Sequence, residues 1–388
     1  MTEKNGGQQL PLPLTKLDSL TRALLSFAEQ EARDLPWRRD MTPYRVWVSE
    51  IMLQQTRTEV VRRYYPRFLE ALPDVSSLAD ADGDALAKLW EGLGYYRRAS
   101  LMQRAARIVK EKYGGELPAD YRLLRELPGF GDYTAGAVAS FAFGLRAPAV
   151  DGNLLRVLAR LFGEEDNVLS SACAKRLSSF AWKMLPPPLA DTEAALEQKN
   201  QKDGAYLYDG YAAAAWNQAM MELGAQICLP NTTPHCESCP LSPYCVACAE
   251  GSAARLPVRI TGTKRRFEEK TVLQMMADGY YVLRRRPDEG LLAGLYEFPN
   301  VQGTLNSAQA AEEVEKLGFT VMDVRPLPSA KHVFTHITWL LTGYQIEVAP
   351  DRLPYGYLLA TEEELHTRYS VPGAFNAYKP KKKSNAFE

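Results

Sequence analysis

Two carboxylic acids stand in contrasting sequence surroundings. Glu50 lies in the apolar segment 46–53 (VWVSEIML), where burial would raise its pKa and keep a transferable proton on the side chain. Asp151 directly precedes the segment GNLLRVL, as a helix N-cap residue does, and a helix N-terminus favours its ionised form. If the two side chains meet, one acid is protonated and the other charged, which suits cleavage of a glycosidic bond. Taken singly, Glu50 could also lie on an exposed helix stripe, and Asp151 could be a helix cap alone.

A cysteine cluster is the second chemical feature, because five of the six cysteines lie between positions 228 and 248. Cys228, Cys236, Cys239 and Cys245 are separated by seven, two and five residues. Four thiolates so close in sequence suit a cubane iron–sulfur cluster, whose ligands surround one compact centre. Zinc is the alternative, because Cys245 and Cys248 form a second C-x-x-C pair beside the pair at 236 and 239.

A glycine-rich hairpin is the third feature. The segment 127–135 (LPGFGDYTA) places Gly129 and Gly131 directly before an apolar helix. Glycine allows a sharp turn and close backbone approach, and the amides at the start of the following helix can bind a phosphate without a basic side chain. The alternative is an ordinary turn between two helices. A mononucleotide P-loop is excluded, because the Gly-Lys-Ser/Thr ending is missing.

The composition indicates a globular chain. It has 388 residues, of which 46% are hydrophobic and 24% charged, with a net charge of −1. These values exclude a disordered or fibrous protein, and any nucleic-acid binding must use a local basic surface or backbone groups. The longest apolar run is too short to cross a bilayer and no N-terminal signal is visible. We therefore expect a soluble monomer without a membrane partner, cytoplasmic in a bacterium and nuclear or mitochondrial in a eukaryote.

The pattern along the chain predicts two structured parts. We expect a flexible tail at 1–16, a helical part at 17–250, a basic linker at 251–267 and a smaller α+β domain at 268–388. Within the last part the sequence predicts a helix at 307–317 and several strands. The predicted strands are 271–276, 280–284, 333–342 and 343–348.

Together these segments resemble the helix–hairpin–helix DNA glycosylases, and among them the MutY-type adenine DNA glycosylases. The resemblance covers nearly the whole chain and implies a multidomain fold. An all-α helix–hairpin–helix glycosylase core with an iron–sulfur cluster loop at 228–245 would precede a C-terminal α+β Nudix-like domain. The matching motifs are LPWR at 35–38, VSEIMLQQT at 48–56, EGLGYY at 91–96, LPGFGDYTA at 127–135 and VDGN at 150–153.

The resemblance implies a reaction and a DNA partner. Adenine paired with 8-oxoguanine, or with guanine, would be flipped out of double-stranded DNA and excised, which prevents G:C to T:A transversions. Glu50 would protonate adenine at N7, and Asp151 would stabilise the sugar cation or trap it covalently. Tyr133 and Asn153 would position that carboxylate. A lysine at position 133 marks the bifunctional endonuclease III-like branch; tyrosine cannot form an imine, so we expect a monofunctional enzyme.

The same resemblance assigns DNA contacts. Trp37 and Arg38 would shape the base pocket, whereas Gln55 and Tyr95 would fill or wedge the opened stack. Tyr95 has the alternative of being a core aromatic residue. The hairpin glycines would bind the DNA backbone, and the basic linker could contact other repair proteins.

The resemblance also implies a structural [4Fe–4S] cluster close to DNA, held by Cys228, Cys236, Cys239 and Cys245. The chain departs from the family at the first cysteine gap, which has seven residues where the family usually has six. That gap also contains no lysine or arginine, although the family uses this loop for a phosphate contact.

The C-terminal segments VLRRR at 282–286 and GLYEFP at 294–299 resemble the Nudix fold. Its catalytic box, at 311–317, lacks the arginine and one metal-binding glutamate, so we expect a recognition domain. Phe334, Thr335 and His336 resemble the family's Phe-Ser-His loop that detects 8-oxoguanine. His332 and His336 could instead be metal ligands or ordinary strand residues.

Three other functions remain open at this point. One is an endonuclease III-like bifunctional glycosylase, which Tyr133 and the second domain disfavour. Another is a catalytically silent lesion-binding protein, which the presence of both Glu50 and Asp151 disfavours. The third is a Nudix hydrolase, which the broken catalytic box disfavours.

Overall fold

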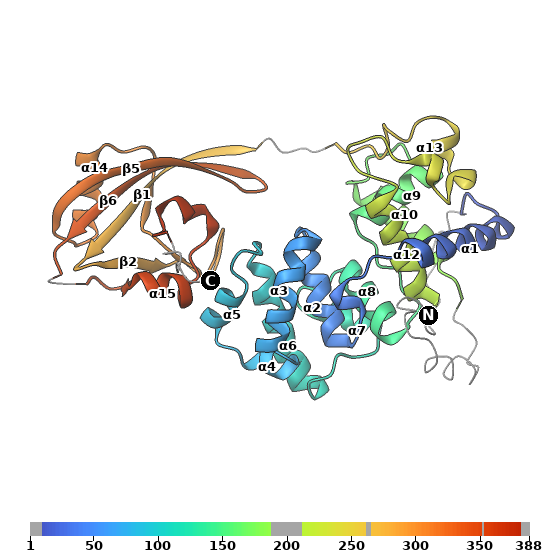
Figure 1. Cartoon of the computed structure of the whole chain (residues 1–388), viewed down its shortest axis with the longest axis horizontal. Coiled ribbons are helices and arrows are strands. Elements are labelled where there is room, and N and C mark those ends of the chain that lie inside the picture. The colour runs from blue at the N-terminus through green and yellow to red at the C-terminus, as the bar shows by residue number, and fades with distance from the viewer. Residues whose placement is uncertain (1–9, 188–211, 261–264, 351–352, 382–388) are drawn as a thin grey trace, which may run out of the picture. The chain divides into compact units, whose positions relative to one another are not determined.

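The computed structural model describes residues 10–187, 212–260, 265–350 and 353–381 (Figure 1). Contacts divide the chain into two compact units, Met1–Ala79 with Arg104–Thr261, and Asp80–Gln103 with Gly262–Glu388. The first nine residues of the predicted tail at 1–16 lie outside the described residues. Within the described part, no helix combines the length and the apolar character that crossing a bilayer requires.

The first unit is helical, as the sequence predicts. Thr42 precedes α2 and Pro43 is its first residue, where proline's fixed φ suits a helix start. The helices are α1 (Leu14–Glu31), α2 (Pro43–Leu53), α3 (Thr58–Ala71), α4 (Val75–Asp80), α6 (Arg97–Tyr113), α7 (Tyr121–Glu126), α8 (Asp132–Phe143), α9 (Gly152–Phe162), α10 (Ser171–Met184), α12 (Ala212–Gln226) and α13 (Val246–Ala249), with 3-10 turns η1 (Pro36–Arg38), η3 (Cys236–Ser238) and η4 (Ser242–Tyr244).

The packing of these helices brings distant acidic residues together. Helix α2 packs on α8, and α12 packs on both α8 and α9. The approach of α8 to the chain before α9 depends on Gly136, because a Cβ there would lie 2.1 Å from the carbonyl oxygen of Pro148. Glu50 is thereby carried on α2, which packs on α8, and Asp151 precedes α9, which packs on α12, while α8 and α12 pack on each other.

The second unit contains a seven-stranded mixed sheet with the order β3-β2-β1-β6-β5, in which β4 pairs with β1 and β7 with β2. The central strands β1 and β6 are parallel, from Arg266 opposite Ile337 to Met276 opposite Glu347. The strands are β1 (Arg266–Ala277), β2 (Tyr280–Arg285), β3 (Tyr296–Glu297), β4 (Asn300–Gln302), β5 (Val321–Val333), β6 (Ile337–Val348) and β7 (Tyr357–Ala360).

Each face of this sheet carries its own apolar core. Helix α14 (Ser307–Lys316) covers one face with Ala310 and Val314, and α15 (Glu362–Thr367) with the turn η5 (Gly373–Tyr378) covers the other. Gly343 in β6 allows the Tyr378 ring to lie against the strand, since a Cβ there would be 2.2 Å from the ring. The predicted helix at 307–317 and the strands at 271–276 and 280–284 are confirmed.

The strand at 343–348 is confirmed, but the bounds of the strand predicted at 333–342 were wrong. Residue 333 is the end of β5, residues 334–336 form a loop, and residues 337–348 form one continuous strand, β6. The sequence did not predict β5 (Val321–Val333), because Pro326 and Pro328 argue against a strand. The structure accommodates the prolines on a strand that pairs on one side with β6 and shifts register between Leu327 and Ala330.

The predicted linker at 251–267 is shorter in the structure. Residues 251–260 pack on the helical unit, where Arg160 Nε donates to the Leu256 carbonyl at 2.8 Å and Val168 N to Val258 O at 3.0 Å. At the other end, Arg266 and Phe267 already belong to β1. Between the two packed ends lie residues 261–265, of which 261–264 are outside the described residues.

Residues 80–103, which fall inside the predicted helical part at 17–250, group with the C-terminal residues instead. They include α5 (Gly83–Leu89) and the start of α6. Lys88 Nζ donates to the carbonyl oxygens of Leu365 and Tyr369 at 3.1 and 3.2 Å. The Tyr296 hydroxyl donates to Asp84 at 2.7 Å, which adds a polar contact within this unit.

Candidate active site

Glu50 has a buried carboxyl group on α2, with only 5% of the residue exposed. The Tyr133 hydroxyl on α8 donates a hydrogen bond to its Oε2, and not to Asp151, the carboxylate that the resemblance implies for it. Burial raises the pKa of Glu50 from 4.5 to about 7, while the Tyr133 hydrogen bond and the Arg38 charge lower it, and the Asp151 charge raises it. A substantial fraction of this acid is therefore protonated near neutral pH, as the sequence predicts.

Asp151 is the N-cap of α9, as predicted. Its Oδ1 accepts from Leu154 N at 2.7 Å, and its Oδ2 accepts from the Asn153 side-chain amide at 2.8 Å. Burial nevertheless raises the pKa of Asp151, against the lowering effect of these hydrogen bonds. The helix N-terminus alone predicted a more acidic group; the structure adds desolvation, which that argument did not include.

A cavity of about 270 Å³ brings the predicted pocket residues together. Its lining combines polar and charged side chains with apolar ones. Those of the sequence-predicted residues that line it are Trp37, Arg38, Glu50, Tyr133, Asp151 and Asn153. Gln55 does not line it; this residue is exposed just beyond α2 and has a left-handed φ of 58°.

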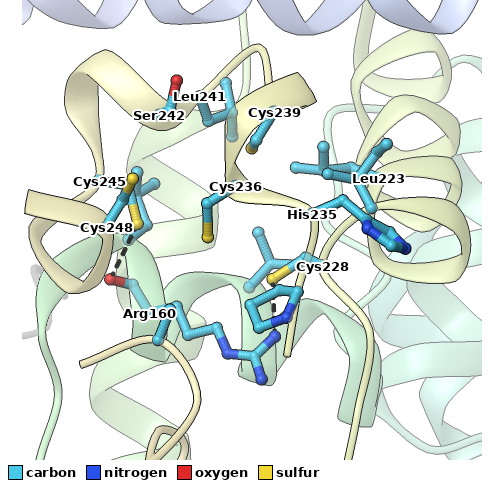
Figure 2. Close-up of a pocket in the computed structure, with 15 residues that line it drawn as sticks. Arg160, Leu223, Cys228, His235, Cys236, Cys239, Leu241, Ser242, Cys245 and Cys248 are labelled. Carbon is cyan, nitrogen blue, oxygen red and sulfur yellow. Dashed lines mark hydrogen bonds between the residues drawn. The ribbon is translucent and has the colours of Figure 1, made fainter. Parts of the chain in front are cut away.

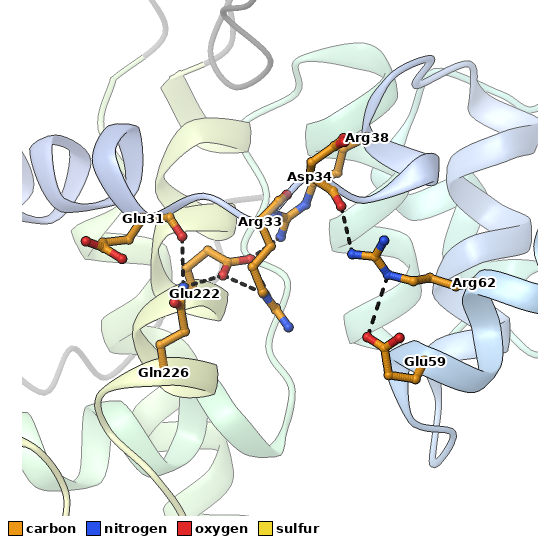
Figure 3. A network of polar contacts seen from close by, with 8 residues as sticks. All are labelled: Glu31, Arg33, Asp34, Arg38, Glu59, Arg62, Glu222 and Gln226. Atoms are coloured by element: carbon orange, nitrogen blue, oxygen red, sulfur yellow. Dashed lines mark hydrogen bonds and ion pairs between the residues drawn. The ribbon is translucent and has the colours of Figure 1, made fainter.

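A buried ion-pair network beside this cavity was not predicted from the sequence (Figure 3). Glu222 on α12 has a fully buried side chain that accepts from Arg33 Nε at 2.8 Å and pairs with Arg38 Nη2 at 2.5 Å. Gln226 also donates to it at 2.7 Å. Burial works to raise the pKa of Glu222, but the two arginines hold it below its ordinary value. Glu222 thus fixes Arg38, which lines the cavity.

Gln218 is a second residue that the sequence analysis missed. It lies on α12, one helical turn before Glu222, and it lines the cavity although only 2% of the residue is exposed. Its Oε1 has no hydrogen-bond partner within the described part of the chain, while its Nε2 lies 3.5 Å from the Met41 sulfur. A buried acceptor of this kind is costly unless a ligand satisfies it.

The predicted hairpin is present between α7 and α8. Gly129 has a left-handed φ of 83°, and Gly131 is the N-cap of α8. Both glycines are exposed. Since the first amides of an α-helix have no partner within the helix, this exposed turn offers N–H groups to an anion. The Phe130 amide is tied to the Leu127 carbonyl at 3.0 Å, which closes the turn.

The cysteines surround a small cavity of about 30 Å³ (Figure 2). Arg160 crosses this region, because its Nη1 donates to Cys228 Sγ at 3.2 Å and its carbonyl accepts from Cys245 Sγ at 3.3 Å. Among the described residues, no three metal-binding side chains converge closely enough to hold a single ion. The cavity is lined by Cys228, Cys236, Cys239, Cys245 and Cys248, together with Leu161, Leu223, Ile227, Leu241 and other neighbours.

This donor set fits an iron–sulfur cluster. Thiolates are its usual ligands, and an apolar lining with one buried cation, Arg160, is a setting in which a negatively charged cluster can be held. Burial raises the pKa of Cys239 to about 12 and that of Cys245 to about 11. These thiols therefore stay protonated on their own, and binding to iron would displace their protons.

The predicted lesion loop lies between β5 and β6 in the second unit. The Phe334 ring packs edge-on against His332 and Trp339, with ring centroids 4.5 and 4.8 Å apart. Thr335 and His336 are exposed. The Thr335 hydroxyl lies 2.8 Å from the Tyr95 hydroxyl, and half of Tyr95 is exposed, so Tyr95 is not a core residue.

The broken Nudix box forms α14 as expected. Glu313 pairs with Lys316 at 2.6 Å, and Glu312 and Glu315 are exposed. No cluster of three potential metal ligands occurs in the described residues of this unit.

Comparison with known proteins assigns a family to a part of each of the two structured regions. The sequence model of the HhH-GPD superfamily of base excision DNA repair proteins matches residues 48–185, and that of the NUDIX domain matches residues 271–379. Adenine DNA glycosylase of Homo sapiens is 32% identical, over 89% of this chain and 70% of the human protein. The adenine DNA glycosylase of Buchnera aphidicola subsp. Baizongia pistaciae is 30% identical, over 79% of each chain.

Among solved structures, that of a thermostable thymine-DNA glycosylase is similar to this chain, with 28% identity and a TM-score of 0.51. The similarity covers 61% of this chain and 98% of that one. Together with the two matched domains, it confirms the predicted fold class, a helix–hairpin–helix glycosylase core followed by a Nudix-like domain.

Proposed function

The chain belongs to the adenine DNA glycosylase family, and from this premise we propose that it removes adenine paired with 8-oxoguanine, or with guanine, from duplex DNA. It is a base excision repair enzyme that hydrolyses N-glycosyl bonds. The observation that carries the finer proposal is the cavity shared by Glu50, Tyr133 and Asp151. Removal of this adenine would prevent G:C to T:A transversions.

The first chemical step is proton transfer by Glu50. Because a glycosidic bond cannot be reached inside the base stack, the adenine must enter the cavity as a flipped nucleotide. Glu50 then donates its proton to N7 of adenine, which makes the base a neutral leaving group. A pKa of about 7 leaves the acid partly protonated at neutral pH, and the Tyr133 hydrogen bond orients the carboxyl group.

Asp151 acts on the sugar. As the base leaves, positive charge develops on the deoxyribose, and a carboxylate stabilises that charge or traps it as a covalent intermediate before water arrives. Asn153 and the Leu154 amide each hold one oxygen of Asp151, so its orientation is set before DNA binds. Tyr133 has no amine with which to form an imine, so the enzyme is monofunctional.

The remaining cavity residues select and hold the base. Trp37 provides a flat wall, and Arg38 is fixed by Glu222 at the edge of the same cavity. The unpaired Gln218 Oε1 can accept a hydrogen bond from the exocyclic amino group of adenine. Guanine carries an oxygen at that ring position, which would face the Gln218 acceptor unfavourably.

DNA binding uses several separate elements. The hairpin with Gly129 and Gly131 presents backbone amides to a phosphate, and Gln55 and Tyr95 occupy or wedge the opened stack. Phe334, Thr335 and His336 recognise 8-oxoguanine through a ring contact and polar groups.

The cysteine loop would hold a [4Fe–4S] cluster through Cys228, Cys236, Cys239 and Cys245. When bound, the cluster supplies a structural cross-link that orders this loop close to DNA. The Arg160 guanidinium contacts the Cys228 sulfur and holds the Leu229 carbonyl at 2.9 Å, so it ties the loop to α9. Zinc is the less suitable occupant, because four thiols spread around one cavity match a larger centre than a single ion.

We also infer from the sequence how the chain divides into domains, and in which compartment and with which partners the enzyme acts. The proposed domain plan is a tail at 1–16, a glycosylase domain at 17–250 and a lesion-recognition domain at 268–388, and the family matches at 48–185 and 271–379 support the two domains. Helix α1 begins at Leu14, inside the tail of this plan, and residues 80–103 group with the C-terminal unit. The enzyme would act as a monomer, in the bacterial cytoplasm or in a eukaryotic nucleus or mitochondrion. Repair proteins could bind the basic segment between the two domains.

The decisive experiment uses a duplex that carries one adenine opposite 8-oxoguanine. The purified protein is incubated with it, and half of the sample is treated with alkali. Strand cleavage at the adenine only after alkali, and none with Glu50→Gln, is the expected result. Cleavage without alkali would indicate a lyase, and tight binding without cleavage would indicate a lesion-binding protein, so either outcome would overturn the proposal.

A further inference from the structure

A fifth thiol stands beside the proposed cluster ligands. Cys248 lines the same cavity as Cys228, Cys236, Cys239 and Cys245, yet the ligand pattern assigns it no role. It lies on the short helix α13, three residues after Cys245, and two residues with this spacing share one face of a helical turn. Figure 2 shows its side chain beside that of Cys245, at the edge of the space that Cys236 enters.

Cys248 lies near two of the predicted ligands. Burial raises the pKa of Cys245, while the backbone N–H of Cys248 acts to lower it. The Cys248 thiol lines the same cavity as the thiol of Cys236, whose pKa is raised by burial and by the nearby Cys248 thiol. Cys236 and Cys248 therefore face one cavity, and no other chain segment needs to move for Cys248 to reach the position that Cys236 holds there.

The other two predicted ligands have different neighbours. Cys239 accepts a hydrogen bond from the Leu241 backbone, and Cys228 accepts one from Arg160. The proximity of a spare thiol thus distinguishes Cys236, the first residue of η3, from Cys239, which follows η3 as its C-cap.

The local packing would allow Cys248 to move by a small amount. Its exposure is intermediate, whereas Ala247 next to it is buried with Ala253 and Leu256 in a small apolar cluster that Cys236 and Cys245 also touch. Ala247 and Ala253 in that cluster have small side chains, and rotation about χ1 is the adjustment that the Cys248 thiol would need. A rotation of this kind is cheap compared with an iron–thiolate bond.

We propose that Cys248 is a reserve ligand of the [4Fe–4S] cluster, which binds the iron of Cys236 when Cys236 is lost or chemically modified. This inference rests on the proposed cluster itself. In the exchange the Cys248 thiol releases its proton to solvent as its sulfur binds iron, so that no electron is transferred. The loop would then hold the cluster through Cys228, Cys239, Cys245 and Cys248.

The test compares single variants of matched chemistry. Full-length Cys236→Ala and Cys239→Ala are purified without oxygen, and iron and acid-labile sulfide are measured per folded chain. We expect Cys236→Ala to keep its iron and sulfide, Cys239→Ala to lose them, and the double variant Cys236→Ala with Cys248→Ala to lose them as well. Cys248→Ala alone should keep them, because the four assigned ligands remain.

Several outcomes would overturn the inference. Cys236→Ala could lose its iron as fully as Cys239→Ala, or the double variant could keep it. Loss of iron from Cys248→Ala alone would make Cys248 an ordinary ligand. If the wild-type chain itself contains no iron and sulfide, it is the cluster proposal that fails.

Thiol alkylation of the folded wild-type holoprotein gives a second test that needs no variant. Iodoacetamide followed by peptide mass mapping should label Cys248 while the cluster is intact and protect the four ligands. Cys173 is fully buried and serves as the unlabelled control. Labelling of Cys236 with protection of Cys248 would show that the two roles are reversed and would contradict the inference.

Discussion

The Tyr133 hydroxyl donates a hydrogen bond to the Glu50 carboxylate, although 83 positions separate the two residues in the sequence. Helix α8 supplies the donor and α2 the acceptor, and these two helices pack against each other. The bond opposes the effect of burial, because it lowers the pKa of Glu50 while desolvation raises it. Tyr133 therefore affects both the orientation of the Glu50 carboxyl group, the proposed proton donor, and its pKa.

Replacement of Tyr133 with phenylalanine should shift the pH dependence of excision. Loss of the hydrogen bond raises the pKa of Glu50 above about 7, so the acid stays protonated to higher pH and the decline in rate moves upward. The maximal rate should fall about tenfold, since a hydrogen bond to a charged group contributes about 1.5 kcal/mol. Single-turnover excision across the pH range measures both effects.

Tyr344→Phe is the matched control for that experiment. Its hydroxyl donates to the Leu305 carbonyl at 2.9 Å in the C-terminal unit, and neither residue lines the cavity. The pH dependence should not change in this variant. A rate profile of Tyr133→Phe that keeps its midpoint, or moves to lower pH, would contradict the assigned role of the bond.

Glu50→Gln should abolish excision and also change how stability depends on pH. The folded protein holds the Glu50 proton more tightly than the unfolded chain, whose carboxyl pKa is near 4.5. The contribution of Glu50 to the free energy of unfolding is therefore complete below the unfolded pKa and is lost as pH rises to about 7. The loss is about 3 kcal/mol, since each pH unit between the two pKa values corresponds to about 1.36 kcal/mol. Glutamine does not ionise, so the variant should be more stable than wild type above about pH 7.

Urea unfolding of both proteins at two pH values tests this prediction. The stability difference should be large near pH 8 and small near pH 5, as the linkage of proton binding to folding requires. An equal difference at the two pH values would mean that Glu50 does not titrate between them. Retained DNA binding by the variant would show that its loss of excision is chemical.

Glu50 and Asp151 could be identified in the sequence as candidates from the residues next to them alone. An acid within an apolar helical run and an acid before a helix start can both be read from neighbouring residues. Glu222 had a similar signal in the segment MMELG, but its partners Arg33 and Arg38 are 189 and 184 positions away, so the network could not be inferred. The raised pKa of Asp151 likewise depends on burial by distant segments.

The C-terminal unit shows the same limit. The helix at 307–316 has an Asn306 capping box with Gln309, and such local hydrogen bonds make its start predictable. Strand β5 contains two prolines, and only its pairing with β6 identifies it as a strand. Tertiary pairing outweighed local preference there, as it commonly does for strands.

Neutralising Glu222 should destabilise the helical unit. Glu222→Gln leaves Arg33 and Arg38 beside a neutral group, and breaking a buried ion pair costs about 3 kcal/mol or more. Excision should also slow, because Arg38 would no longer be held at the cavity. Chemical denaturation and single-turnover assays measure the two effects.

An exposed ion pair provides the control for that variant. Glu59 pairs with Arg62 at 3.6 Å, and 82% of the Glu59 side chain is exposed. Its replacement by glutamine should change stability by less than about 1 kcal/mol. A Glu222→Gln protein as stable as Glu59→Gln would mean that the buried network contributes little.

Gly136→Ala should prevent the close packing of α8 against the chain before α9. A Cβ at this position would lie 2.1 Å from the Pro148 carbonyl oxygen, and that backbone leads directly to Asp151. We expect a destabilisation of about 3 kcal/mol, or loss of soluble protein, as forced overpacking of a core causes. Gly152→Ala is the control, because a Cβ at Gly152 meets nothing within 4 Å. Similar thermal unfolding of the two variants would contradict the packing argument.

The contact between Tyr95 and Thr335 allows the role of the lesion loop to be tested by removing one hydroxyl group at a time. Thr335→Ala removes the hydroxyl that lies 2.8 Å from the Tyr95 hydroxyl, and with it a polar group that could reach 8-oxoguanine. The preference for adenine opposite 8-oxoguanine over adenine opposite guanine should fall about tenfold, the effect of one hydrogen bond of roughly 1.4 kcal/mol. Thr335→Ser should restore it, because serine keeps the hydroxyl group.

The Tyr95→Phe variant separates the two uses of that hydroxyl group. If Thr335 recognises the lesion directly, Tyr95→Phe keeps the preference, since the threonine hydroxyl remains available. If the Tyr95 contact is what orients Thr335, both variants lose the preference to the same extent. An unchanged preference in Thr335→Ala combined with His336→Ala would show that the loop does not recognise 8-oxoguanine, and the domain would then need another role.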